Sequence, residues 1–135
     1  MKLITEFYLN LFKENSLMKK SIEISVLGMG YVGLPLAIEF GKIFKVNGYD
    51  INSKRITELK KSIDITNAVN KKDFFYAKKL IFTDSLQDLI NSEVFIITVP
   101  TPVDKKNRPD LSHLIKASEL VGKIIKNNSY VIYES

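Results

Sequence analysis

Residues 22–33 of this 135-residue chain read IEISVLGMGYVG, and they are the strongest indicator of its fold. Its first half is rich in β-branched residues, which predicts a buried strand. That strand runs directly into a Gly-x-Gly-x-x-Gly pattern formed by Gly28, Gly30 and Gly33. Apolar residues then recur at helical spacing over 31–44, which predicts a helix. A strand, this glycine pattern and a helix in succession are typical of a dinucleotide-binding crossover.

Each glycine has a separate predicted role. Gly28 permits the tight turn off the strand, Gly30 leaves room for a pyrophosphate beside the backbone, and Gly33 lets the helix pack closely on the sheet. Pro35 falls in the first helical turn, where its missing N–H has no partner to lose. The free N–H groups and partial positive charge of that helix end favour phosphates. The segment predicts a phosphate site built from Gly28, Met29, Gly30, Tyr31, Val32 and Gly33.

The second predicted strand, residues 45–50, ends in an acidic residue, Asp50. A carboxylate at this strand end accepts hydrogen bonds from the ribose hydroxyls of a dinucleotide and repels a 2′-phosphate. We therefore expect NAD rather than NADP as the cofactor. Arg55 works against this preference, because a nearby guanidinium can accommodate that phosphate, but Asp50 is expected to dominate. The alternative is a helix-capping Asp50 beside a surface arginine.

A second candidate segment, residues 98–104 with the sequence TVPTPVD, follows an apolar strand predicted over 93–99. In a doubly wound sheet, ligands bind where the strand order reverses, next to this strand. The two prolines stiffen the segment, so that Pro100 and the hydroxyl of Thr101 could be presented to the cofactor. The alternative is a rigid turn without a ligand.

Strand and helix patterns alternate through the rest of the chain. This alternation predicts an α/β fold, a Rossmann-type doubly wound parallel sheet of about five strands in the order 3-2-1-4-5. Residues 1–20 are predicted as an N-terminal helical extension, with an amphipathic helix over 3–18, and residues 21–135 as one domain. The remaining predictions are a helix over 53–61, a loop with a short helix over 62–79, a strand over 80–83, a brief helix to Ile90 capped by Asp84 or Ser85, a helix to Lys126 capped by Asp110 or Ser112, and a strand over 129–133.

Composition narrows the class of protein. The chain is 45% hydrophobic and 26% charged, as in an ordinary soluble domain, and it has no Cys, which excludes a cysteine nucleophile or thiolate metal site within these 135 residues. The net charge of +5 is concentrated in residues 41–80, which hold ten Lys or Arg against four Asp or Glu. We interpret this excess as solvated helix faces, with attraction of an anionic small molecule as the alternative. Neither nucleic acid nor a membrane is an expected partner, and a cytoplasmic location is expected.

Three polar residues at or after the end of the 98–104 segment are candidates for a catalytic or metal-binding role. His113 is the only histidine, and we expect it at a helix start, in a surface or capping role on the far side of the loop from a substrate. Asp104 and Asp110 could suggest paired carboxylates, but nothing beside them completes a ligand set. Loop and capping roles are therefore predicted for both, with no metal and no catalytic residue in this chain.

Beyond these motifs, the chain resembles the UDP-glucose/GDP-mannose dehydrogenase family. The resemblance rests on GMGYVGLPLA at 28–37, GYDINSKRI at 48–56, FIITVPTPVD at 95–104, PDLS at 109–112 and VIYES at 131–135. The VPTPVD form, together with the spacing of Asp64 and Thr66, is similar to the branch that acts on UDP-N-acetylhexosamines in bacterial surface-polysaccharide synthesis, which includes capsule and O-antigen. Two departures are Ser62, where relatives often have Gly, and Asn67-Ala68, where Gly-Glu is usual.

The resemblance implies a function and further site residues. It places Gly28 to Gly33, Asp50, Arg55, Thr101 and Ser135 at NAD-contacting positions. It implies an NAD-dependent UDP-sugar 6-dehydrogenase, with a homo-oligomeric full-length enzyme whose catalytic Cys, Lys and Asn lie in a substrate domain beyond these residues. UDP-glucose or UDP-N-acetylmannosamine as the substrate is one alternative, and a non-catalytic nucleotide-binding module is another.

Overall fold

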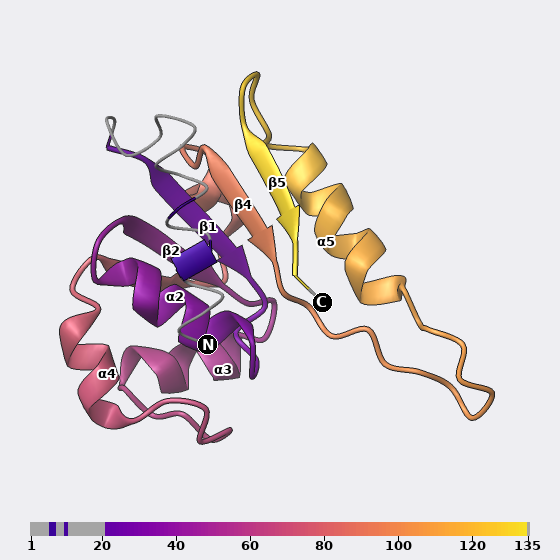
Figure 1. Cartoon of the computed structure of the whole chain (residues 1–135), viewed down its shortest axis with the longest axis horizontal. Coiled ribbons are helices and arrows are strands. Elements are labelled where there is room, and N and C mark those ends of the chain that lie inside the picture. Colours follow the sequence, from indigo (N-terminus) through magenta and orange to yellow (C-terminus); the bar gives the residue numbers. More distant parts are fainter. Residues whose placement is uncertain (1–5, 8–9, 11–20, 135) are drawn as a thin grey trace.

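A computed structural model describes residues 6–7, 10 and 21–134. The predicted helix over 3–18 therefore lies largely outside the described residues, and Ser135 lies outside them as well. Residues 21–134 form an α/β structure with a parallel sheet at its centre (Figure 1). Its architecture confirms the predicted fold class.

The sheet has five strands, all parallel, in the order β3-β2-β1-β4-β5. The central strand β1 pairs with β2 on one side and β4 on the other, so that Val26 lies opposite Gly48 and Ile96. This is the predicted strand order, which reverses between β1 and β4. The strands are β1 (Glu23–Leu27), β2 (Lys45–Tyr49), β3 (Leu80–Thr83), β4 (Val94–Ile97) and β5 (Tyr130–Tyr133).

Helices cover both faces of the sheet, and each face has its own core cluster (Figure 1). One cluster joins β1 to Phe40 and Ile56, whereas the other joins Phe95 and Val121. Residues in β4 are buried throughout, as a strand covered on both faces requires. The helices are α2 (Gly33–Gly41), α3 (Ser53–Lys60), α4 (Lys71–Tyr76), the 3₁₀ helix η2 (Leu86–Leu89) and α5 (Ser112–Gly122).

Two helices end earlier than their apolar patterns predict. α2 ends at Gly41 and α5 at Gly122. After each helix the backbone tightens into a turn with i→i+3 hydrogen bonds, such as that from the Ile43 N–H to the Phe40 carbonyl. The predicted side-chain caps are borne out only in part. Ser85 precedes η2 without a capping bond from its side chain, and Ser112 is the first residue of α5 rather than its cap. Asp110 accepts a hydrogen bond from the Ser112 N–H and so satisfies one free donor of that helix end, as its predicted capping role requires.

α3 ends in a Schellman motif that contains an unfavourable residue. Ile63 N–H donates to the Glu58 carbonyl and Ser62 N–H to the Leu59 carbonyl, and Ser62 has a φ of 57°. Glycine adopts this left-handed conformation without steric cost, whereas serine does not. Asn67, the other departure from the family pattern, is also left-handed, with a φ of 52°.

Replacing Ser62 with glycine is therefore expected to stabilise the domain by about 0.5–1 kcal/mol, because relief of strain exceeds the added freedom of the unfolded chain. Urea unfolding of the 135-residue chain measures the change. Ser118→Gly, inside α5, is the control and is expected to destabilise the domain. A destabilised Ser62→Gly variant would contradict the prediction.

Candidate functional site

A cavity of about 520 Å³ opens at the carboxyl ends of β1, β2 and β4, where the strand order reverses. This is the crevice in which doubly wound sheets bind their ligands. Six of the predicted site residues line it: Gly28, Met29, Gly30, Asp50, Arg55 and Pro100. The other four described members of the predicted set lie outside its lining: Tyr31, Val32, Gly33 and Thr101.

The three glycines are required for three different reasons. Gly28 has a φ of +101°, and a Cβ there would lie 3.1 Å from the Thr98 carbonyl oxygen. A Cβ on Gly33 would overlap the Gly28 carbonyl oxygen and the Thr98 hydroxyl. A Cβ on Gly30, in contrast, would meet nothing within 4 Å. Gly28 and Gly33 therefore shape the turn, whereas Gly30 keeps open a space beside the backbone.

Thr98 supports this turn, although its role was not predicted. Its buried hydroxyl lies 2.9 Å from the Leu27 carbonyl oxygen and 2.8 Å from that of Gly28. Thr98 N–H also donates to the Leu27 carbonyl, which extends the pairing of β4 beyond Ile97. The only sequence signal for Thr98 is its place at the end of an apolar strand beside the reversal point.

Asp50 links the glycine turn to the end of β2. Its Oδ2 accepts a hydrogen bond from Met29 N–H at 2.8 Å, and its Oδ1 accepts one from Asn52 N–H at 2.9 Å. The side chain that caps α3 is Asn52, which accepts from the N–H groups of Lys54 and Arg55. The capping alternative for Asp50 is therefore wrong, and its carboxylate lines the cavity with further acceptor capacity.

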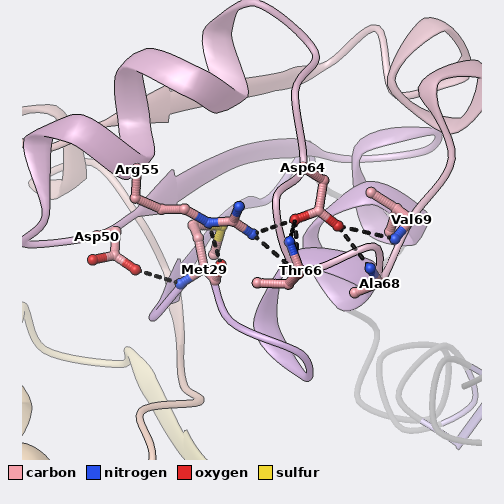
Figure 2. A network of polar contacts seen from close by, with 7 residues as sticks. All are labelled: Met29, Asp50, Arg55, Asp64, Thr66, Ala68 and Val69. Carbon is pink, nitrogen blue, oxygen red and sulfur yellow. Dashed lines mark hydrogen bonds and ion pairs between the residues drawn. The ribbon is translucent and has the colours of Figure 1, made fainter.

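Arg55 is buried, with 6% of its surface exposed, so the surface-arginine alternative is also wrong. Its Nε donates to the Met29 carbonyl at 3.0 Å, and its Nη2 donates to Asp64 Oδ1 at 2.7 Å (Figure 2). Its Nη1 is buried and has no hydrogen-bond partner among the described residues. The helix that carries Arg55 packs its Ile56 and Leu59 into the core, which turns the guanidinium toward the glycine turn.

Asp64 anchors the loop after α3. Besides Arg55, its carboxylate accepts hydrogen bonds from the N–H groups of Thr66, Ala68 and Val69 and from the Thr66 hydroxyl (Figure 2). Only 2% of its side chain is exposed. Burial acts to raise the pKa of Asp64, but the hydrogen bonds from Thr66, Arg55 and the backbone outweigh it and lower the pKa to about 2.

This pKa predicts a specific loss of stability in acid. The pKa of Asp64 is about 2 in the folded chain and 3.8 ordinarily, so the unfolded chain takes up this proton first as the pH falls. The network therefore contributes about 2 kcal/mol above pH 4, which is lost between pH 4 and 2. In urea unfolding at pH 5 and pH 2.5, Asp64→Asn should show a smaller acid loss than the wild type. Glu119→Gln, at an exposed carboxylate of α5, is the control and should lose as much stability in acid as the wild type. Equal acid losses in wild type and Asp64→Asn would contradict the prediction.

His113 does not lie where the sequence predicted it. It is exposed in the first turn of α5, as expected, but it lines the cavity together with Lys116 of the same helix. α5 packs against β4, and this packing places its first turns beside the crevice. Lys54 and Lys116 add positive charge to the lining, whereas Asp50 and Glu58 add negative charge.

The loop after β4 extends away from the body of the domain (Figure 1). A bridge between Val103 and Pro109 closes it, and Asp104 accepts hydrogen bonds from the N–H groups of Lys106 and Arg108. These bonds confirm the loop role of Asp104. The hydrogen bond from the Arg108 N–H, followed by that from the Lys106 N–H, lowers the pKa of the Asp104 carboxyl. Within the described residues, no cluster of acidic residues and histidine could hold a metal ion.

Comparison with known proteins identifies the domain. Residues 22–135 match the model for the UDP-glucose/GDP-mannose dehydrogenase family, NAD binding domain. The chain belongs to this family. Two relatives in the family are UDP-N-acetyl-D-glucosamine 6-dehydrogenase of Pseudomonas aeruginosa, 53% identical over 86% of this chain, and Protein CapL of Staphylococcus aureus, 49% identical over 83%. This UDP-glucose/GDP-mannose dehydrogenase domain covers only 28% and 26% of those proteins, respectively.

Solved structures of the family have the same fold. The UDP-N-acetyl-mannosamine dehydrogenase Cap5O from S. aureus aligns with a TM-score of 0.74 and 32% identity over 84% of this chain and 28% of its own. The UDP-D-ManNAc dehydrogenase from Pyrococcus horikoshii aligns with a TM-score of 0.73 and 38% identity over the same shares. In the part of the chain that the structure describes, no helix has the length and apolar character to cross a membrane.

Proposed function

We propose that this chain is the NAD-binding domain of a UDP-N-acetylhexosamine 6-dehydrogenase that serves bacterial surface-polysaccharide synthesis. The observation that carries the proposal is the open space beside Gly30, which shares one cavity with the Asp50 carboxylate. A cavity of about 520 Å³ is within the range of cofactor sites. A cytoplasmic, homo-oligomeric full-length enzyme is part of the proposal.

The residues present fit a dinucleotide. The space at Gly30 and the first N–H groups of α2 would hold the pyrophosphate, because phosphate oxygens accept hydrogen bonds from a helix N-terminus. Asp50 would accept hydrogen bonds from the adenosine ribose hydroxyls. Bound NAD would supply a hydride acceptor for oxidation of the substrate alcohol. Contacts of Pro100, Thr101, Tyr31 and Val32 with the cofactor remain predictions.

The substrate is assigned by similarity within the family. The P. aeruginosa and Salmonella typhi relatives named UDP-N-acetyl-D-glucosamine 6-dehydrogenase are 53% and 45% identical to this chain. A relative named UDP-N-acetyl-D-mannosamine dehydrogenase, in P. horikoshii, is 39% identical to this chain. The identities favour the glucosamine sugar, and the mannosamine sugar is the second candidate. Assay of the full-length protein against both sugars would distinguish them.

NAD is expected to bind the 135-residue chain more tightly than NADP, because the Asp50 carboxylate repels a 2′-phosphate. Repulsion between two charges close together is expected to weaken NADP binding about tenfold or more. Isothermal titration calorimetry with both dinucleotides in one buffer measures the ratio of their dissociation constants. Equal affinities, or tighter binding of NADP, would refute the role given to Asp50.

The 135-residue chain by itself is expected not to oxidise a nucleotide sugar, even with saturating NAD. The covalent route that the family resemblance implies needs a thiolate, and these residues include no Cys. The absorbance of NADH at 340 nm, recorded with UDP-N-acetylglucosamine, UDP-N-acetylmannosamine and UDP-glucose, checks this expectation. Steady formation of NADH by the purified chain would show that a base within it, such as His113, supports the reaction.

A further inference from the structure

We infer that Asp64 determines the cofactor preference of this domain by holding Arg55 away from the 2′-position of the bound ribose. Asp64 is thus a positioning residue that acts through Arg55. The inference rests on the proposed function, because it takes the ribose to lie against Asp50. It extends that function by naming a second carboxylate, in a different loop, that disfavours NADP.

The backbone of Met29 connects Arg55 to Asp50. Met29 N–H donates to Asp50, and the Met29 carbonyl accepts from Arg55 Nε (Figure 2). The guanidinium and the carboxylate therefore contact opposite ends of one residue of the glycine turn. An arginine close to the ribose-binding acid is the usual partner of a 2′-phosphate in NADP-binding domains.

In this chain, however, the guanidinium already has a partner. Arg55 Nη2 and Asp64 Oδ1 are 2.7 Å apart, and 7% and 2% of the two side chains are exposed. Four further hydrogen bonds hold the Asp64 carboxylate in its loop. If Arg55 turned toward a phosphate, Asp64 would remain as a buried charge without its counter-ion, which is costly.

The other contacts of Arg55 would not prevent such a movement. Its Nη1 is buried without a hydrogen-bond partner in the described residues, and its Nε makes one bond to a backbone carbonyl. Its Nη2 also lies 3.5 Å from the Thr66 hydroxyl, a neutral contact at the long limit of a hydrogen bond. The ion pair with Asp64 is thus the main interaction that fixes the guanidinium. Without the charge at position 64, Arg55 would gain both a counter-ion and a partner for Nη1 by moving to a 2′-phosphate.

The test is calorimetry of NAD and NADP with the wild-type chain, Asp64→Asn and the double variant Arg55→Met/Asp64→Asn. In Asp64→Asn, the ratio of the NADP to the NAD dissociation constant should fall about tenfold, the effect of one charge-assisted contact. The double variant should restore the wild-type ratio, because it has no guanidinium to reach the 2′-phosphate. Lys54 and Lys116, which also line the cavity, are the same in all three chains and so cannot account for a difference between them. Asp104→Asn makes the same chemical change at an exposed ion pair with Arg108 and should leave the ratio unchanged.

The outcomes separate this inference from the proposed function. If NAD and NADP weaken equally in Asp64→Asn, the residue is only structural and the inference is overturned, while the proposed function stands. A relaxed ratio that persists in the double variant also overturns it, because Arg55 is then not the cause. If the wild-type chain binds no NAD, the proposed function fails and the inference fails with it.

A second measurement applies even if Asp64→Asn does not fold. The Arg55 Nε–H signal of the wild-type chain is followed by ¹⁵N-resolved NMR during titration with adenosine 2′,5′-bisphosphate. We expect the signal to keep its position at saturation, because Asp64 retains the guanidinium. A shift of that signal at saturation, absent in a parallel titration with adenosine 5′-monophosphate, would show that Arg55 reaches the 2′-phosphate and would overturn the inference.

Discussion

Replacing Gly30 with valine is expected to weaken NAD binding about 100-fold or more, a loss of roughly 3 kcal/mol of binding free energy. A Cβ at this position meets nothing within 4 Å, and the φ of Gly30 lies outside the left-handed region, so the folded chain can accept a side chain there. The branched side chain would instead occupy the space proposed for the pyrophosphate. Calorimetry gives the affinity, and thermal unfolding should show a midpoint close to that of the wild type.

Gly122→Ala is the control for this substitution. Gly122 also has open space around its Cβ position, but it lies at the end of α5 and outside the lining of the cavity. NAD affinity should be unchanged, and the helix should gain about 0.5–1 kcal/mol of stability. Unchanged NAD affinity in a folded Gly30→Val chain would mean that the glycine pattern forms a turn and nothing more.

Replacing Gly33 with alanine is expected to have the opposite effect, a large loss of stability. The new Cβ would overlap the Gly28 carbonyl oxygen and the Thr98 hydroxyl, and that hydroxyl is itself bonded to two carbonyls. Neither atom is the free end of a flexible side chain, so the turn or the start of α2 must shift. We expect a cost of about 3 kcal/mol or more in the free energy of unfolding, at the upper end of overpacking effects.

Urea unfolding of Gly33→Ala beside Gly30→Ala tests this difference. Both variants add one methyl group to the same turn, three residues apart, and only the first creates an overlap. Gly30→Ala should change the free energy of unfolding by less than about 1 kcal/mol. Similar free energies of unfolding for the two variants would contradict the packing seen around Gly33.

Much of the fold follows from local patterns in the sequence. Three features were predicted: the strand before Gly28, the helix after Gly33 and the acid at the end of β2. Each depends on residues that are close together in the sequence, namely a β-branched run, apolar residues at helical spacing, or a glycine that can adopt a positive φ. The strand order followed from the handedness of crossover connections. Ser62 was noted as a departure from the family pattern, in which glycine is frequent, but its left-handed conformation is seen only in the structure.

Short-range sequence patterns are sufficient to specify a doubly wound sheet, a glycine turn and an acidic strand end. Which side chains meet at that site depends on tertiary packing. The burial of Arg55 depends on Asp64, nine residues later in the loop, and the support of the glycine turn depends on Thr98, seventy residues after Gly28. His113 reaches the cavity because α5 packs on β4. Periodicity assigns a residue to a face of an element, but the partner of a buried charge is set by the packing of segments that are distant in sequence.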